Sequence, residues 1–356
     1  MSAALTRPTA PPARPLPAGR RHLLRGSRGR LVGLVVAAVA LAAAVLASVL
    51  VGNYAISIDD VLAAVSGPAE TDTDRIVAHV RIPRTVAGLL AGTALGVAGA
   101  VMQGITRNPL AGPGILGINS GAALAVVIAM TVFGVTGVGG YVWFAFAGAA
   151  IAAVFVYSLG SLGFGGATPV KLALAGAAFT ALVSAVTTAI TLLDVTTLND
   201  FRFWVVGSLT RADGTALAAV APFIAVGAVA AFATSRTLNV VALGDDMARS
   251  LGTTLWSARI LAAVAVVLLA GSATAIAGPI AFIGLVVPHI ARLITGPDYR
   301  WIMAWTVVLA PTLLLAADVL GRILVSPQTL QVGIITGLAG APFFLYLVRN
   351  RKVSGL

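Results

Sequence analysis

The sequence predicts an all-α, polytopic membrane protein with about ten transmembrane helices. Of the 356 residues, 59% are apolar and only 10% are charged, whereas an ordinary soluble domain has roughly 25% charged residues. Long stretches lack any charged side chain, and a crossing of the hydrocarbon layer needs about 20 apolar residues in helical form. Clusters of glycine and proline divide the longest stretches into pieces of helix length.

The charge-free stretches place the spans along the chain. Residues 108–170 lack a charge over a length that requires several crossings, and the glycine-rich segment 134–140 separates two of them. Residues 277–279 and 326–327 divide two later stretches in the same way. We predict spans at about 31–52, 85–106, 114–133, 141–160, 171–193, 214–235, 257–277, 279–293, 301–325 and 332–348.

Basic residues orient these spans, because Lys and Arg stay preferentially on the cytoplasmic side. With an even number of spans and the N-terminus inside, 17 of the 23 basic residues fall inside and 6 outside. Residues 1–30 carry seven of them and are predicted to form a Pro-rich, disordered cytoplasmic tail that touches membrane lipid. The net charge of +11 is concentrated there, so it does not indicate nucleic-acid binding. The transmembrane domain is predicted over 31–352, with both termini in the cytoplasm.

Residue content excludes several kinds of chemistry. The absence of cysteine removes disulfides, thiolate metal sites and thiol catalysis. The three histidines, His22, His79 and His289, are far apart, so no metal site is expected. The sequence has no P-loop pattern and no catalytic cluster, so energy must come from a partner or from an ion gradient. We expect no catalytic residue and no cofactor bound by this chain.

The helix predicted at 85–106 has one face almost without side chains. Glycine recurs along it at Gly88, Gly92, Gly96 and Gly99. Small residues let two helix backbones approach closely inside a membrane. The glycines therefore predict close helix packing.

Both ends of this helix interrupt the apolar pattern. At the outer end, Pro83 suits the first helical position, which puts Arg84 in the first turn, where the macrodipole disfavours a cation. Arg84 therefore either contacts lipid headgroups or docks an anionic partner. At the inner end, residues 107–114 contain two prolines and two glycines. They form either a tight loop or a gate, since non-helical backbone at this depth is tolerated where it lines a cavity.

The longest basic connection on the predicted cytoplasmic side, 235–257, contains a short amphipathic helix at about 244–252. Its first turn is acidic, its last turn is basic, and glycines flank both ends. Met247 and Leu251 lie four residues apart and share a face. Such a helix either transmits force from a soluble partner or lies in the membrane interface.

Asp318 and Arg322 lie four residues apart near the outer end of the ninth predicted span, in the favourable order for an ion pair. A charge inside a span costs about 2.5–3.5 kcal/mol on insertion scales. The two residues are therefore expected to neutralise each other, as a structural or as a functional pair.

Several strings along the chain match the motifs of one family in their expected order. They are RIPR (81–84), GAVMQ (99–103), RNPLAGPGILG (107–117), LGDDMARSLG (243–252), AGPIAFIGLVVPHIAR (277–292), AADVLGR (316–322) and GAPFF (340–344). With them the chain resembles the FecCD-like permeases of type II ABC importers for iron–siderophores, haem and vitamin B12. Two further strings, FRFWVVGSL (201–209) and GSATAIAGPIAFIGL (271–285), make it most similar to ferric-enterobactin permease subunits. One departure is TLQVG (329–333), where many members have ELPVG.

The resemblance implies the type II ABC importer permease fold and three sets of site residues. By this resemblance, Arg81, Arg84 and Arg322 are expected to dock a binding protein. By the same resemblance, Asn108, Leu110 and Thr168 are expected to form the cytoplasmic gate. The coupling helix would seat in a groove of the ATPase and is expected to consist of Asp245, Asp246, Met247, Ala248, Arg249, Leu251 and Gly252.

The resemblance also implies a function. The chain is expected to pass a ferric siderophore, of catecholate type, from a binding protein into the cytoplasm by alternating access. Expected partners in the bacterial cytoplasmic membrane are a P-loop ATPase dimer, which holds ATP and magnesium, an extracytoplasmic siderophore-binding lipoprotein and a second, related permease chain. Import of haem or cobalamin is the alternative within the family. An ion-coupled secondary transporter usually needs intramembrane acids, whereas Asp318 is the only acid well inside a predicted span.

Overall fold

The computed structural model describes residues 23–24, 26–67, 71–135, 137–163 and 168–350. Within these ranges, every regular element is a helix. Seven helices are long and apolar enough to cross a membrane, and three shorter apolar helices accompany them. Together they occupy the ten predicted spans. Most of the predicted tail lies outside the described residues, although its last five residues already belong to the first helix.

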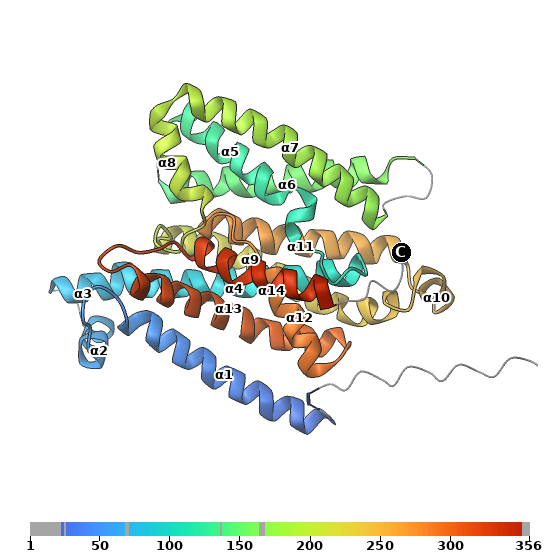
Figure 1. Ribbon diagram of the computed structural model, residues 1–356, viewed down its shortest axis with the longest axis horizontal. Helices are drawn as coiled ribbons and strands as arrows, with labels where there is room; N and C mark the ends of the chain where they lie inside the picture. The colour runs from blue at the N-terminus through green and yellow to red at the C-terminus, as the bar shows by residue number, and fades with distance from the viewer. Residues whose placement is uncertain (1–22, 25, 68–70, 136, 164–167, 351–356) are drawn as a thin grey trace, which may run out of the picture.

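The helices run along the long axis of the molecule (Figure 1). The long ones are α1 (Gly26–Leu50), α4 (Ile82–Ile105), α6 (Val138–Ser161), α7 (Pro169–Leu193), α9 (Gly214–Val241), α11 (Leu255–Ala277) and α13 (Tyr299–Leu324). Shorter apolar helices are α5 (Ile118–Phe133), α12 (Ile283–Thr295) and α14 (Val332–Asn350). The remaining elements are α2 (Ile58–Ser66), α3 (Asp72–Ile76), the π-helical turn η1 (Val77–Arg81), the 3-10 turn η2 (Pro113–Leu116), α8 (Val195–Val205) and α10 (Asp245–Ser250). Because α2 and α10 lie at opposite ends, we call these the α2 end and the α10 end.

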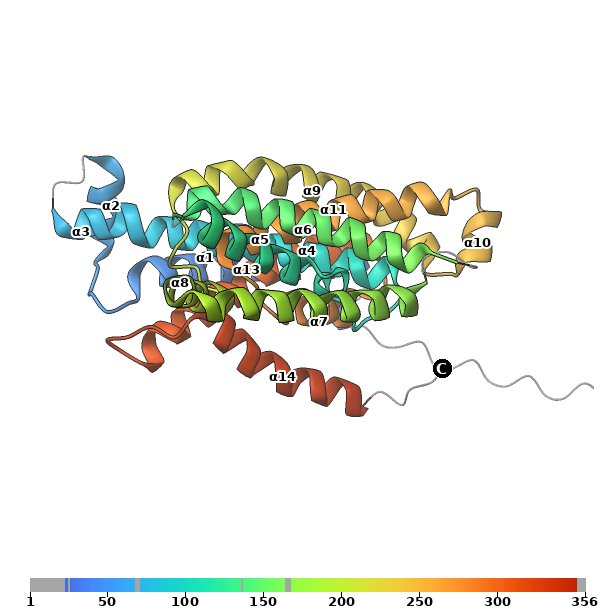
Figure 2. The ribbon, with the colours of Figure 1, turned by 90° about the horizontal axis from the view of Figure 1, so that it is seen from above.

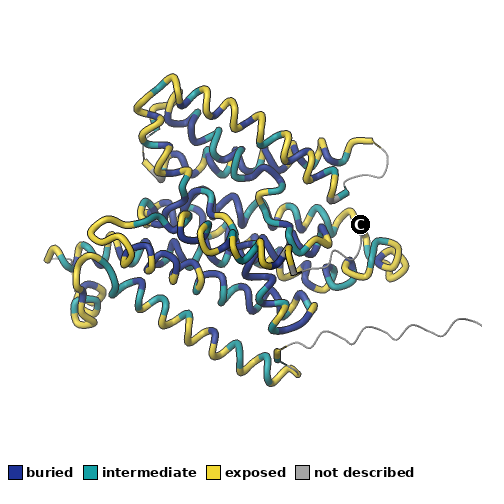
Figure 3. The backbone as a smooth tube through the Cα atoms, viewed as in Figure 1, coloured by how far each residue is buried: buried dark blue, intermediate teal, exposed yellow. Residues whose placement is uncertain are grey.

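Helix α4 lies at the centre of the bundle. In the continuous helical stretch that contains it, 78% of the residues in the most apolar 18-residue segment are buried. The corresponding values are 11% for α1 and 22% for α7. Helices α13, α11, α9 and α12 pack around it. Figure 3 shows this buried centre and the exposed outer helices. Exposed apolar helices such as α1 and α7 suit a lipid environment, and α14 diverges from the bundle in the second view (Figure 2).

The glycine face of α4 makes its central position possible. Gly88, Gly92 and Gly96 face α13, and a Cβ on Gly92 would lie 2.5 Å from the Cα of Pro311. Gly99 faces the first turn of α12, where a Cβ would overlap the backbone. Any larger side chain at these positions would separate α4 from its neighbours.

The start of α4 differs from the sequence prediction. Pro83 does not begin a helix, because α3, η1 and α4 form one helical stretch, Asp72–Ile105. The π-helical turn directly precedes the proline, whose ring would clash with the carbonyl four residues earlier in a regular α-helix. Arg84 therefore lies well inside a helical stretch, and the unfavourable effect of the macrodipole on a first-turn cation no longer applies to it.

Three helices at the α2 end were not predicted, namely α2, α3 and α8. Helices α2 and α3 each begin with a capping box, in which Ser57 pairs with Asp60 and Thr71 with Asp74. Helix α8 is capped by Asp194, whose carboxylate accepts a hydrogen bond from the backbone N–H of Thr196. The capping boxes are readable as Ser/Thr-x-x-Asp patterns, but the search for charge-free runs passed over these polar segments.

Candidate functional site

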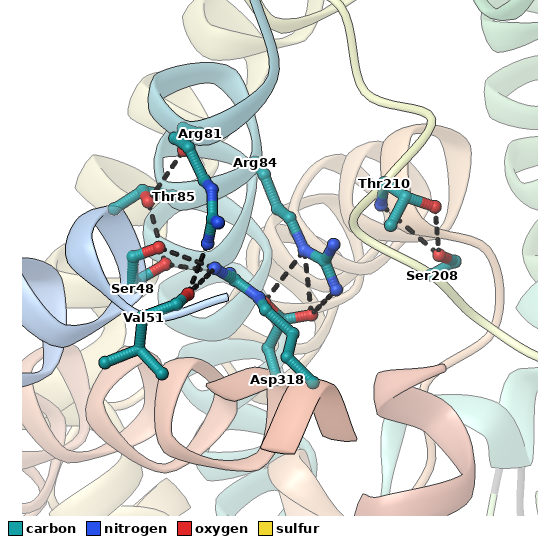
Figure 4. Close-up of polar contacts among 9 residues, drawn as sticks. Ser48, Val51, Arg81, Arg84, Thr85, Ser208, Thr210 and Asp318 are labelled. Atoms are coloured by element: carbon teal, nitrogen blue, oxygen red, sulfur yellow. Dashed lines mark hydrogen bonds and ion pairs between the residues drawn. The ribbon is translucent and has the colours of Figure 1, made fainter. Parts of the chain in front are cut away.

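Four charged side chains meet where α1, α4 and α13 come together at the α2 end (Figure 4). Arg81, Arg84 and Arg322 are only 6%, 7% and 3% exposed, and Asp318 is fully buried. A buried charge is costly unless it is paired and hydrogen-bonded. Each of these side chains therefore needs a partner inside the protein, and we call the four residues the arginine cluster.

Asp318 accepts hydrogen bonds from two of the three arginines. Arg84 donates from Nη2 to Oδ1 at 2.8 Å and from Nε to Oδ2 at 2.9 Å. Arg322 donates from Nε to Oδ2 at 3.1 Å, and its Nη2 contacts the same oxygen. Arg322 also donates to the carbonyl oxygen of Ser48 at 2.6 Å. The ion pair predicted between Asp318 and Arg322 is confirmed, and Arg84 shares it.

Arg81 is held by carbonyl groups. It donates to the carbonyl oxygens of Val51 and Tyr54, the latter at 3.4 Å. The arginine cluster thus contains three guanidinium groups and one carboxylate, which leaves an excess of positive charge among the described residues. All three arginines line a pocket of about 270 Å³. The three arginines predicted to dock a binding protein thus lie in the wall of a pocket, because Asp318 and the end of α1 hold their guanidinium groups inside.

At the α10 end, α4 gives way to the non-helical segment 106–112. The side-chain oxygen of Asn108 accepts a hydrogen bond from the N–H of Leu110 at 2.9 Å. The carbonyl oxygen of Asn108 accepts another from Ala111 at 3.1 Å. Arg107 has a φ of 51°, in the left-handed region that residues with a Cβ rarely adopt. The segment is therefore a compact, locally hydrogen-bonded turn.

A cavity of about 260 Å³ separates this part of the chain from the α11–α12 connection. Residues 112–115 line one side and residues between 280 and 285 line the other. Phe282 has a φ of 68° and packs against Gly340 of α14. Irregular backbone that lines a cavity is the arrangement tolerated within a membrane protein. Among the described residues, no group of three or more His, Asp or Glu side chains is placed to hold a metal ion.

Thr168 belongs to the start of α7 and not to the turn at 106–112. Its hydroxyl oxygen accepts a hydrogen bond from the N–H of Lys171 at 3.3 Å and caps the helix. Residues 164–167, directly before it, lie outside the described part of the chain. No hydrogen bond between described residues joins Thr168 to Asn108 or Leu110. A gate formed by these three residues stays a prediction.

Helix α10 is shorter than the helix predicted there, because a glycine with positive φ stands near each end. Gly244 has a φ of 108° and Gly252 a φ of 78°. Ala248 is fully buried, whereas Met247 and Leu251 are 53% and 59% exposed. The predicted apolar face is thus uncovered in this chain and is accessible to a partner.

Asp245, at the start of α10, contacts two other elements. Its Oδ2 accepts a hydrogen bond from Nη2 of Arg259 in α11 at 2.9 Å. Its Oδ1 lies 3.3 Å from Nη2 of Arg107, at the end of α4. Asp246 and Arg249, in contrast, pair with each other across one turn of α10 and are largely exposed. The sequence placed Asp245 in the acidic first turn of the coupling helix, and no local pattern pointed to its two distant partners.

Comparisons with known proteins agree with this architecture. The model of the FecCD transport family matches residues 40–350. The chain is 42% identical over 308 residues to the ferric enterobactin transport system permease protein of Escherichia coli (strain K12), covering 86% of this chain and 92% of the relative. It is 40% identical over 283 residues to the cobalamin import system permease protein of Halobacterium salinarum, covering 79% and 75%. A solved structure described as an inward-facing metal-chelate type ABC transporter has a TM-score of 0.77 at 27% identity, covering 90% of this chain and 99% of that chain.

Proposed function

The chain belongs to the FecCD transport family and is a multi-pass permease of an ABC importer, and from this premise we propose that its cargo is a ferric siderophore of the catecholate type. The observation that carries this assignment is the 42% identity, over 86% of the chain, to a ferric enterobactin permease. Other relatives are named as permeases for haemin and cobalamin. Import of one of these compounds is therefore the competing function.

The α10 end faces the cytoplasm of a bacterial cell and the α2 end faces outward across the cytoplasmic membrane. The distribution of basic residues along the sequence supports this orientation, because 17 of the 23 are cytoplasmic when the N-terminus is inside. Both termini are then cytoplasmic.

An ATPase dimer binds α10 and supplies the energy for transport. The uncovered side chains of Met247 and Leu251 support this contact, as does the lack of a P-loop in the sequence. ATP and Mg²⁺ are held by that partner and not by this chain. Replacing both residues with Glu should abolish co-purification of the ATPase with the chain. Leu62→Glu is the matched control, since Leu62 is 62% exposed at the opposite end. Retention of the ATPase by the double variant would contradict the contact.

A substrate-binding lipoprotein docks at the α2 end, over the pocket lined by Arg81, Arg84 and Arg322. The excess positive charge of the arginine cluster supports this docking. An acidic side chain entering the pocket would neutralise that charge where little water screens it. Arg81 is the arginine that most readily accepts a new partner, because it bonds only to carbonyl oxygens in the described chain.

The released chelate crosses between this chain and a second, related permease chain. ATP-driven movement of α10 exchanges which of the outer and cytoplasmic gates is open. Asn108, Leu110 and Thr168 contribute to the cytoplasmic gate. The cavity beside residues 112–115 supports a gate at this level. The low charge of the spans suits a bulky chelate that needs a wide path more than dedicated ligands.

Uptake by the reconstituted importer tests the cargo. Vesicles that contain the chain, its partner permease, the ATPase and the binding protein would be offered a radiolabelled ferric catecholate, haemin or cobalamin. We expect ATP-dependent accumulation of iron from the ferric catecholate alone. Accumulation of haemin or cobalamin in its place would assign the chain to the competing function.

A further inference from the structure

Helix α10 is a short helix with a glycine of positive φ near each end. Gly244 and Gly252 bracket it with φ angles of 108° and 78°, which side chains with a Cβ rarely adopt. Within α10, Ala248 is the buried residue. Burial of one alanine contributes little to fixing the position of a helix of six residues. The position of α10 relative to the bundle therefore depends on its side-chain contacts.

Asp245 provides these contacts with both of its carboxylate oxygens. Oδ2 accepts a hydrogen bond from Arg259 of α11 at 2.9 Å, and Oδ1 faces Arg107 at 3.3 Å. The side chains of Asp245, Arg259 and Arg107 are 28%, 26% and 41% exposed. Water and salt screen such partly buried pairs less than pairs on an open surface. One carboxylate thus joins α10 to two different elements of the bundle.

The two contacts differ in quality. The Arg259 contact is a hydrogen bond, whereas Oδ1 of Asp245 is buried and accepts no hydrogen bond from the described residues despite its proximity to Arg107. A buried oxygen without a hydrogen bond is unfavourable. A small shift of the Arg107 guanidinium toward Oδ1 would therefore be favoured. Arg259 anchors the carboxylate, and Arg107 forms the contact that can tighten or loosen.

Arg107 leads directly into the turn at 106–112. Its backbone is in the left-handed region, and such conformations persist only where the surroundings hold them. Its Nη1 also lies 3.8 Å from the place where a Cβ of Gly244 would stand. The next residue, Asn108, organises the turn through its hydrogen bond with Leu110. A displacement of the start of α10 would therefore act on the Arg107 side chain, which contacts Asp245 and lies beside Gly244.

From these contacts we propose that Asp245 is a positioning residue for transport, which anchors α10 to α11 through Arg259 and passes the movement of α10 to the turn at 106–112 through Arg107. The proposal rests on the proposed function, in which the ATPase moves α10. Asp246 does not share this role, because its carboxylate is fully exposed and its one ion pair among the described residues is with Arg249 of the same helix.

Coupling between ATP hydrolysis and transport tests the proposal. The complete importer in vesicles would carry Asp245→Asn, Arg107→Gln or both. We expect each single variant to raise the number of ATP molecules hydrolysed per cargo molecule by about tenfold, and the double variant to be no worse than either. Asp245→Glu, which keeps the charge, should retain most of the coupling. Arg300→Gln is the control for loss of an exposed cationic side chain at the same end.

A distance measurement separates transmission from mere stability. The chain has no cysteine, so spin labels can be attached to cysteines introduced at Ser250 in α10 and at Pro109 in the turn. In the complex with the ATPase, we expect a nonhydrolysable ATP analogue to leave the distance between the labels unchanged in wild type, because both segments move together. In Arg107→Gln the distance should change, because α10 moves alone.

The outcomes distinguish the two proposals. If wild-type vesicles import the ferric catecholate and both single variants keep the wild-type coupling ratio, the link through Asp245 is wrong and the proposed function stands. An unchanged label distance in Arg107→Gln, with α10 still bound to the ATPase, would also overturn the link. If wild-type vesicles import no ferric catecholate, the cargo assignment fails. The label distance still tests the link in that case, because it needs only the ATPase and nucleotide.

Discussion

Removal of the Asp318 carboxylate is expected to destabilise the protein strongly. Asp318 is fully buried and accepts hydrogen bonds from both Arg84 and Arg322. In Asp318→Asn these two guanidinium groups stay buried without their counter-charge, and Arg81 adds a third positive charge nearby. Breaking a buried pair by removal of one partner costs about 3–5 kcal/mol. We expect a loss of that size in the free energy of unfolding.

Denaturation in mixed detergent micelles, followed by the fluorescence of the five tryptophans, measures this free energy. The matched control is Asp72→Asn, because Asp72 pairs with Arg75 at 3.7 Å on an open surface, with side-chain exposures of 97% and 63%. Loss of such an exposed pair should change stability by less than about 0.5 kcal/mol. In an Arg84→Gln background, the cost of Asp318→Asn should fall by roughly 0.5–3 kcal/mol, because one of the stranded charges is gone. If Asp318→Asn lies within about 1 kcal/mol of wild type, the arginine cluster is not held together by this carboxylate.

Three further substitutions test other parts of the structure. Gly92→Leu should cost about 1–3 kcal/mol or more, because its Cβ would lie 2.5 Å from the Cα of Pro311, whereas Gly112→Leu should be tolerated, because no atom lies within 4 Å of its Cβ. The same denaturation assay compares the two, and equal losses would contradict the packing of α4 on α13. Thr168→Ala removes the cap of α7, so the first turn should become less stable by about 1 kcal/mol, measured by hydrogen exchange of its amides, and unchanged exchange would contradict the cap. Arg81→Gln should weaken binding of the substrate-binding protein by at least about tenfold without loss of folding, and unaltered affinity in a surface-binding assay would remove Arg81 from the docking site.

Much of the fold could be predicted from the sequence because the membrane imposes a simple requirement. A span must be long, apolar and helical, and the ten predicted spans coincide with helices of the structure. Helices α2, α3 and α8 were missed because short polar helices at the membrane surface meet no such requirement. The helical entry into α4 was also misjudged, because Pro83 fits a first turn and the interior of a helix that a π-helical turn has widened.

The candidate sites could be predicted only as far as their contacts are local. Asp318 and Arg322 lie four residues apart on one helix, so their pairing follows from helix geometry. The third member, Arg84, lies 234 positions away from Asp318, and only the packing of α4 against α13 joins them. The sequence shows that Arg84 carries a charge, but not that the folded chain itself supplies the counter-charge. A long separation in sequence likewise concealed the contact of Asp245 with Arg107.

The most direct measurement is transport by purified protein in sealed vesicles, with and without the ATPase. The sequence contains no P-loop pattern, and the uncovered side chains of Met247 and Leu251 at the α10 end are predicted to contact a separate ATPase. We therefore expect vesicles with the permease chains and the binding protein to accumulate no iron chelate until the ATPase and ATP are supplied. Accumulation against a gradient by vesicles that lack the ATPase would show that another energy source drives this protein.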